Sequence, residues 1–392
     1  MSDPRPALSR RSLRRMLALL CVMVRAIQPL HAAEADGAPP ISPGFSYVAD
    51  AVTVLDGGAG RGGVVIGRAD AWVDVDGGVV GLGALSAHVD LMAVHGPDLS
   101  GRWVGDAQGV SNIAAPPQHH LFEAWLRWRL SDNAAPLAIT AKAGLIDLNS
   151  EFDVQAIGAL FIHSSHGSGP ELGQSGPNGP SVFPVAASGV VLTGATHGNA
   201  MLRLGVFDAL AGSVDDANLP ALRLPGTTGA LVIGQVDVPV AALGEGGGVH
   251  LGAWRYSRPQ PRTDDETAAA WSQGVFALVE VSFAPKWHGW VRAGLADART
   301  NAVVGYCGAG VVRDAGDWQL GLAMARAWLG AQTRRTLGAR TAETALELTA
   351  ARAVTRWMTI QPDLQYVIAP SWDLALRNAL VAGLRLRLNW AR

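Results

Sequence analysis

Polar and apolar residues alternate with a period of two through most of this chain, rather than with the period of a helix. Three stretches show the alternation clearly: Gly67–Asp76 (GRADAWVDVD), Phe122–Leu130 (FEAWLRWRL) and Gly383–Trp390 (GLRLRLNW). Successive side chains of a strand point to opposite faces of a sheet. Each stretch is therefore predicted to be a strand with one charged and one apolar face.

Similar stretches recur at residues 201–208, 251–257, 274–283, 289–297 and 344–350. Turn sequences such as VDGG, LSDNAAP and GEGGG separate them, which predicts strands joined in sequence into an antiparallel sheet. Residues 333–350 could equally form a helix. We find no composition break that would mark a linker, so the sequence after residue 35 is predicted to be one domain, residues 36–392.

Alternation alone fits two architectures. A soluble sandwich turns its apolar face inward, whereas a transmembrane barrel turns it toward lipid and closes the sheet around a wet lumen. Aromatic residues near the strand ends favour the barrel, since aromatic rings concentrate at the headgroup level of a membrane. These are Trp254, Tyr256, Trp287, Trp290, Trp357, Trp372 and Trp390.

Two further features favour the barrel. Arginines lie near the middle of several polar faces, where a water-filled channel would hydrate them and an apolar core would not. The roughly 357 residues after the leader, divided among about 16 strands, leave about 22 residues for each strand and its connector. The fold class predicted is all-β: a transmembrane antiparallel β-barrel of about 16 strands.

Composition supports export. Residues 1–35 carry Arg10, Arg11, Arg14 and Arg15, then an apolar run, then small residues around Ala33, which predicts a secretory signal peptide. Removal of this segment leaves 25 bases against 31 acids, so nucleic acid is not an expected partner. Only Cys307 remains, which excludes an intramolecular disulfide.

Several longer segments resemble a known family. They are GRWVGDAQGVSNI (101–113), GLIDLNSEF (144–152), FIHSSHGSGPELGQSGPNGPSVFPV (161–185), RLGVFDA (203–209), GWVRAGLAD (289–297) and IQPDLQYVIAPS with NALVAGLRLRL (360–388). In this order they resemble the carbohydrate-selective porins of the OprB type. The resemblance implies an outer-membrane barrel of a Gram-negative cell through which sugars diffuse passively. It also implies that the barrel-assembly machinery inserts the protein into outer-membrane lipid, where the barrel is a monomer or a trimer. It implies no cofactor and no catalysis.

A long segment rich in Gly, Ser, Pro and Asn, Gly167–Pro184, follows His163 and His166. In porins a long connector can fold back into the lumen and narrow it, and the turn-forming residues here suit that role or that of a surface loop. Histidines without a matching pattern of Cys or carboxylates are expected to be loop residues rather than metal ligands.

A polar channel wall is the predicted site. Sugar hydroxyls would hydrogen-bond to paired Arg and carboxylate groups, and sugar rings would stack on aromatic faces, with weak binding that permits flux. The candidate lining residues are Arg68, Trp72, Asp74, Glu123, Trp125, Arg127, Arg129, Glu280, Arg292, Glu347, Arg385 and Arg387. Each could instead be a structural wall residue held by ion pairs. The alternative function is an exported, soluble, β-rich protein that binds or cleaves glycans.

Overall fold

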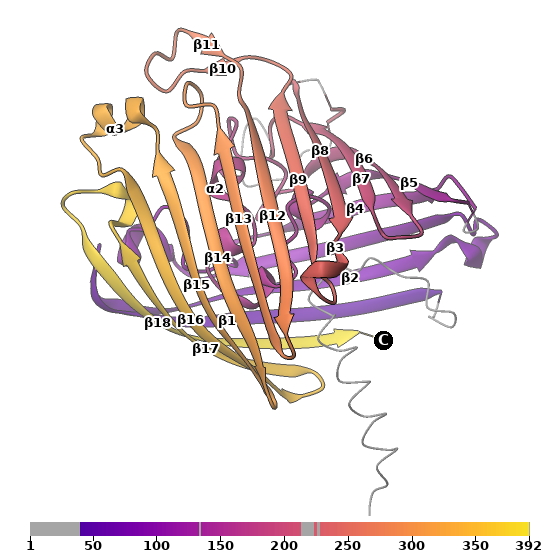
Figure 1. Cartoon of the computed structure of the whole chain (residues 1–392), viewed down its shortest axis with the longest axis horizontal. Coiled ribbons are helices and arrows are strands. Elements are labelled where there is room, and N and C mark those ends of the chain that lie inside the picture. The colour runs from indigo at the N-terminus through magenta and orange to yellow at the C-terminus, as the bar shows by residue number, and fades with distance from the viewer. Residues whose placement is uncertain (1–39, 133–134, 213–222, 226–227, 392) are drawn as a thin grey trace, which may run out of the picture. The chain divides into compact units, whose positions relative to one another are not determined.

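The computed structural model describes residues 40–132, 135–212, 223–225 and 228–391. The predicted signal peptide, residues 1–35, lies outside this part of the chain. Sixteen strands form a closed antiparallel barrel in which each strand pairs with its neighbour in sequence and β1 pairs with β18. The fold class and the strand number of about 16 predicted from the sequence are confirmed (Figure 1).

The barrel strands are β1 Ile41–Gly58, β2 Gly62–Asp76, β3 Leu85–His95, β4 Gln118–Arg129, β5 Leu137–Ile146, β6 Ala187–Thr196, β7 Met201–Asp208, β8 Ala230–Pro239, β9 Gly248–Tyr256, β12 Gln273–Ala284, β13 Trp287–Ala296, β14 Val303–Ala315, β15 Trp318–Leu329, β16 Ala342–Thr355, β17 Met358–Ile368 and β18 Arg377–Ala391. A small hairpin joins β10 Gln260–Pro261 to β11 Ala269–Ala270. The α-helices are α2 Pro170–Gly173 and α3 Ala331–Leu337. Single turns of 3-10 helix are η2 Gly77–Val80, η4 Leu148–Ser150, η5 Gly158–Leu160, η6 Ser164–His166, η7 Ala241–Leu243 and η8 Pro370–Trp372, and η3 Ser100–Val104 is a π-helical turn. None of the helices in these described ranges is long and apolar enough to cross a membrane.

The ambiguous segment 333–350 contains both structures. Its first part lies in α3 and its second part in β16. The helix ends at Gly338, which adopts a left-handed conformation (φ 62°) that favours glycine, and the Gly338 amide donates to the Arg334 carbonyl. The helical and the strand interpretation were therefore each correct for one half of this segment.

The outer face of the barrel is apolar and exposed. Along β2 to β18 the exposed side chains at alternate positions are mostly apolar, for example Val73, Leu126, Leu204, Val291 and Leu348. A continuous exposed apolar wall is typical of a surface that faces lipid tails. The predicted direction of the alternation is confirmed along most strands.

One strand breaks the alternation. On β4 the register shifts between the pairs Asp90–Glu123 and Leu91–Leu121, so that Phe122 is the extra residue of a β-bulge. Phe122 is buried although it was predicted to share the apolar face of Leu126. The sequence pattern cannot register an inserted residue, and the prediction for this position was wrong.

The aromatic belt is also smaller than predicted. Trp254, Tyr256, Trp290 and Trp372 are buried inside the barrel, whereas Trp287, Trp357 and Trp390 are exposed on its outside. The buried rings pack against chain segments that fill the interior, so the inner face is apolar at these positions. The prediction that all seven rings lie at the headgroup level was wrong for these four.

The connectors at the two ends of the barrel differ in length. The strand pairs β12–β13, β14–β15 and β16–β17 are joined by two residues each, and β6–β7 by four. At the other end lie α3, the β10–β11 hairpin and the long connectors 96–117 and 147–186 (Figure 1). In outer-membrane barrels the short turns face the periplasm and the long loops face outward.

Candidate functional site

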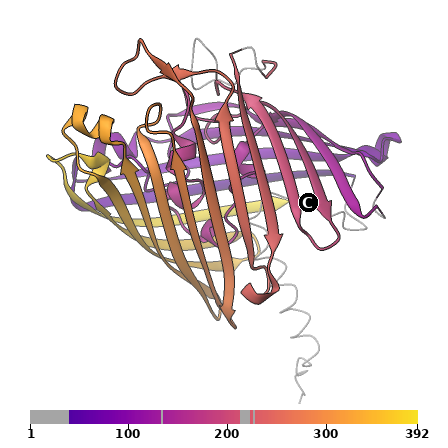
Figure 2. The ribbon, with the colours of Figure 1, turned by 45° about the horizontal axis from the view of Figure 1, so that its top comes forward.

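Two long connectors lie inside the barrel. We call residues 96–117, between β3 and β4, the first insert and residues 147–186, between β5 and β6, the second insert. Figures 1 and 2 show α2 of the second insert within the ring of strands, where it contacts β13 and β14. The hypothesis that the glycine-rich segment folds back into the barrel is confirmed. The surface-loop alternative is wrong.

Wall side chains hold the main chain of the second insert. Glu280 of β12 accepts a hydrogen bond from the Ile157 amide (2.7 Å), and Glu347 of β16 accepts from the amides of Ile162 (2.6 Å) and His163 (3.1 Å). Buried amides of an irregular segment have no ladder partner and need acceptors from elsewhere. These wall carboxylates supply them.

Arg292 of β13 fastens the second insert by charge. Its Nε and Nη2 donate to the Asp153 carboxylate at 3.0 and 2.8 Å, and Nη1 lies 2.7 Å from Oε1 of Glu171. The arginine side chain and both carboxylates are 0% exposed. Burial raises the pKa of Glu171, while Arg292 opposes that rise.

The space around this cluster admits no additional side-chain atom. A Cβ at Gly169 would lie 1.8 Å from Nη1 of Arg292, and a Cβ at Gly294 would lie 1.9 Å from Oε1 of Glu171. Two of the glycines therefore have a packing role: they let the guanidinium and the carboxylates approach each other.

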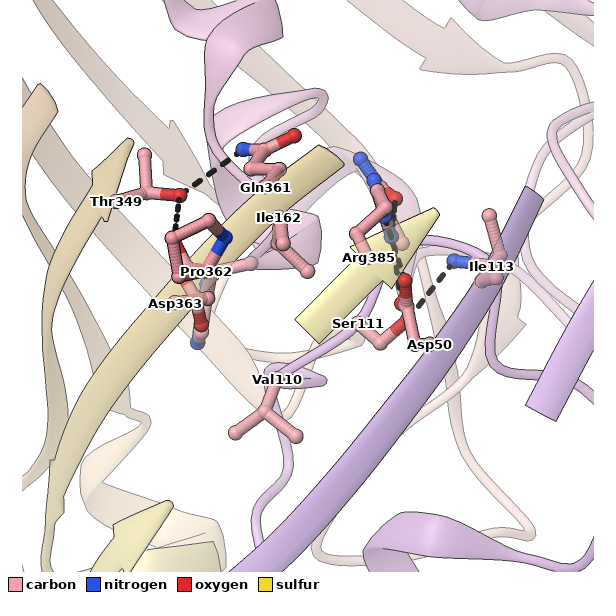
Figure 3. Close-up of polar contacts among 12 residues, drawn as sticks. Asp50, Val110, Ser111, Ile113, Ile162, Thr349, Gln361, Pro362, Asp363 and Arg385 are labelled. Carbon is pink, nitrogen blue, oxygen red and sulfur yellow. Dashed lines mark hydrogen bonds and ion pairs between the residues drawn. The ribbon is translucent and has the colours of Figure 1, made fainter. Parts of the chain in front are cut away.

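The first insert is fastened at the β1–β18 seam. Arg385 of β18 donates to both oxygens of Asp50 on β1 at 2.7 Å and to Oδ1 of Asn112 at 2.8 Å. Ser111 donates to the same aspartate at 2.7 Å (Figure 3). The strand pair that closes the barrel thus also positions the insert.

Both inserts meet near this seam. In Figure 3, Val110 of the first insert and Ile162 of the second flank Asp363 of β17. The three residues, with Asp50 and Arg385, line a small cavity of about 10 Å³. The inserts and the wall therefore form one packed interior on the β16–β18 side.

His163 and His166 lie in this packed interior. Both rings are fully buried, and burial lowers the pKa of His163 to about 3 and that of His166 well below its ordinary value. Nδ1 of His163 accepts from the Ser165 amide at 3.4 Å. Within the described ranges no group of three or more His, Cys, Asp or Glu side chains could hold a metal ion.

The wall formed by β2 to β5 differs, because several of its inward side chains keep contact with solvent, although Asp70, Asp90 and Lys142 are buried. Arg68 of β2 donates to Asp70 at 2.7 and 2.9 Å, and its guanidinium lies 5.0 and 4.7 Å from the ring centroids of Phe122 and Phe183. Its side chain remains 20% exposed. The bulged residue of β4 thus helps to orient an arginine of β2 on the same wall.

Trp125 of β4 is surrounded by other side chains. The His88 ring stacks on it at 5.0 Å, and Nζ of Lys142 and the guanidinium of Arg127 lie 4.0 and 4.9 Å from its centroid. His88 also contacts Asp74, whose side chain is 34% exposed. Trp72 is half-buried and lies against Gly44 of β1, where a Cβ would collide with its ring.

Charged residues of β4 and β5 contact the start of the second insert. Lys142 donates to Glu151 at 2.8 Å, Arg127 lies 3.7 Å from the same carboxylate, and Glu123 accepts from the Asp147 amide at 3.0 Å. Arg129 donates to the Gly83 carbonyl at 2.6 Å. This wall binds the beginning of the insert but is not covered by it.

The structure divides the twelve candidate lining residues into two groups. Those on β2 and β4 are inward and partly exposed: Arg68, Trp72, Asp74, Glu123, Trp125, Arg127 and Arg129. Those on β12, β13, β16 and β18 are inward and buried beneath the inserts: Glu280, Arg292, Glu347 and Arg385. Arg387 lies on the same face of β18 as Arg385 and is partly exposed. The expectation that water hydrates the mid-strand arginines was wrong for Arg292 and Arg385, which are dehydrated and neutralised by carboxylates.

Several residues of this interior were not among the candidates. They are Asp50, Lys142, Glu151, Asp153, Glu171, Gln235 and Glu343, each of which bonds an insert to a wall. The sequence contains one indication that the second insert contacts the inward strand faces. Every charged residue of the second insert, apart from its histidines, is an acid, which matches the arginines and lysine of the inward strand faces.

The sequence matches the model of a known protein family. The sequence model of the carbohydrate-selective porin, OprB family, matches residues 62–390. This chain belongs to the OprB family of carbohydrate-selective porins. OprB of Pseudomonas putida, in its high-pH structure, is similar with a TM-score of 0.77 at 16% identity, over 90% of this chain and 94% of that one.

Other porins share the fold at lower similarity. The outer membrane channel DcaP of Acinetobacter baumannii has a TM-score of 0.54 at 9% identity, over 89% of this OprB-family chain and 97% of that one. A mutant porin of Rh. blastica has a TM-score of 0.52 at 15% identity, over 89% and 100%. None of the curated proteins searched matches the sequence. The protein is an outer-membrane carbohydrate channel, which replaces the alternative of a soluble glycan-binding protein.

Proposed function

We propose that sugars cross this OprB-family barrel along the wall formed by β2 to β5, and that the two inserts exclude them from the β12–β18 wall. The observation that carries the proposal is the difference in exposure between the two walls. The side chains of Asp74 and Arg127 are 34% and 21% exposed, whereas those of Arg292 and Glu347 are 0% exposed. A permeant can contact only groups that it can reach.

The chemistry of this wall suits neutral polyols. Arg68, Arg127 and Arg129 offer several N–H donors each, and Asp74 and Glu123 offer acceptors. Trp72 is the aromatic ring best placed for stacking, since His88, Lys142 and Arg127 already occupy the surroundings of Trp125. Many of these groups are also bound to one another, so each sugar contact is weak and release is fast.

We also propose a route by which the chain reaches the outer membrane. Residues 1–35 act as a cleaved secretory signal peptide, and the barrel-assembly machinery inserts the domain into outer-membrane lipid. The arginine-rich start and the small residues around Ala33 support the first step. Mono- and small oligosaccharides are the permeants proposed, with the barrel as a monomer or a trimer.

The sugar path predicts a specific loss in one double variant. Replacing Arg127 and Arg129 with alanine removes donors from the path, so we expect the sugar concentration that half-blocks the channel to rise about five- to tenfold, equivalent to about 1 kcal/mol. Single-channel recordings in planar bilayers with added mono- and oligosaccharides measure this value. Arg334 and Arg335 of α3, replaced with alanine, provide a control with the same change of charge. Unchanged conductance and unchanged sugar block in the Arg127, Arg129 variant would remove these residues from the path.

A further inference from the structure

Four cationic side chains lie around the short turns of one side of the barrel. Lys286 is in the β12–β13 turn, Arg313 is near the end of β14, and Arg352 and Arg356 lie at the end of β16 and in the turn that follows. All four are exposed. We call this set the basic arc. It lies at the end of the barrel opposite α3 and the β10–β11 hairpin (Figure 1).

The basic arc faces outward, next to the apolar wall. On β14 the exposed outward residue Val311 is followed two positions later by Arg313, and on β16 Leu348 is followed four positions later by Arg352. Even spacing along a strand keeps side chains on one face. The two strand arginines therefore lie on the outward apolar face, toward its short-turn end.

Tryptophan rings accompany the two strand arginines. Trp287 is the cross-strand partner of Arg313, with its centroid 5.1 Å from the guanidinium carbon, and Trp318 is the partner of Arg352 at 5.7 Å. Aromatic rings at a strand end mark the headgroup level of a membrane. The cation–π contact holds each guanidinium at that level.

Only one of the four cations of the basic arc is paired with a carboxylate within the described residues. Asp317 lies 3.3 Å from Arg352, and the described residues include no ion-pair partner for Lys286, Arg313 or Arg356. The other short turns, at residues 77–84, 130–136, 197–200 and 240–247, contain no lysine or arginine. Arg129, at the end of β4, faces inward and donates to the Gly83 carbonyl. The outward positive charge at this end is therefore concentrated on the β12–β17 side.

We propose that the basic arc binds the phosphate groups of anionic phospholipids in the leaflet that surrounds the short turns. Phosphates lie at the depth of the tryptophan rings, and arginine pairs with phosphate through two parallel N–H donors. The partner is a lipid rather than a second protein chain, because the basic arc continues directly into the lipid-facing apolar band. The inference is independent of the sugar path.

Native mass spectrometry of the whole barrel, released from detergent with equal amounts of phosphatidylglycerol and phosphatidylcholine, tests the proposal. The wild-type protein should retain phosphatidylglycerol about tenfold more than phosphatidylcholine. The variant with Lys286→Gln, Arg313→Gln, Arg352→Gln and Arg356→Gln should lose this preference, while its heat-modifiable gel mobility shows that it is folded.

A control variant with the same change of charge distinguishes binding at the basic arc from non-specific attraction between the protein and anionic lipid. Glutamine at Arg102, Arg334, Arg335 and Arg340, which lie in connectors at the opposite end, should leave the preference intact. Equal retention of both lipids by the wild-type protein would overturn the proposal. An equal loss of preference in the control variant, or an oligomer that needs the basic arc in the absence of lipid, would overturn it as well.

Discussion

Replacing Arg292 with methionine should release the second insert from the wall and widen the channel. The substitution leaves Asp153 and Glu171 buried without their cation, and breaking a buried ion pair in this way costs about 3–5 kcal/mol. If the second insert leaves the wall, the two carboxylates are hydrated and this cost disappears. We expect single-channel conductance to increase severalfold and the segment 147–186 to become cleavable by protease.

Two further variants test whether the unpaired carboxylates cause the increase in conductance. Combining Arg292→Met with Asp153→Asn and Glu171→Gln removes the unpaired charges, so docking and conductance should recover in large part. Arg313→Met, on the adjacent strand but facing outward, should conduct like the wild-type protein. Wild-type conductance together with protease resistance in Arg292→Met would show that the ion pairs do not hold the insert.

The docking of the first insert should depend on Glu343 of β16 as strongly as the docking of the second insert depends on Arg292. This carboxylate accepts from the amides of Ala107 (2.9 Å), Gln108 (3.0 Å) and Ser371 (2.5 Å), so it ties two connectors to one strand. In Glu343→Ala the three amides lose their acceptor, and each buried unsatisfied donor costs about 1–3 kcal/mol. We expect faster hydrogen exchange at residues 105–116 and a lower unfolding temperature.

Glutamine at the same position gives a graded comparison. Glu343→Gln keeps one acceptor oxygen, so its exchange rates should lie between those of the wild-type protein and the alanine variant. Glu266→Ala, in an exposed turn of the long-connector end, should change neither quantity. Wild-type protection of the Ala107 and Gln108 amides in Glu343→Ala would exclude the carboxylate as the anchor.

The strands and their outward faces could be predicted because alternation is local. Leu204 and Arg203 point to opposite sides of β7 as neighbours on any strand do, and the apolar side chain is the exposed one. Apolar residues outside and charged residues inside require a closed sheet in lipid. This part of the fold follows from sequence alone.

The contents of the barrel could not be predicted in the same way. Alternation shows that Trp254 and Arg255 lie on opposite faces, but not that an insert covers the tryptophan and places it inside. Arg292 and Asp153 are separated by 139 residues, so no short pattern contains both partners. The acidic charge of the second insert was the available signal, and it becomes informative once the inward cations are known.

The proposed sugar path requires that water and sugars reach the wall formed by β2 to β5 while the inserts seal the β12–β18 wall. Thiol accessibility tests it directly in a Cys307→Ser background. Single cysteines replace Trp72 or Arg127 on one wall, and Ala345 or Thr349, both buried, on the other. A cationic, water-soluble thiol reagent should reduce the conductance of the Trp72→Cys and Arg127→Cys channels and leave the Ala345→Cys and Thr349→Cys channels unchanged. Rapid modification at 345 and 349, with none at 72 and 127, would show that the open path runs along the β12–β18 wall instead.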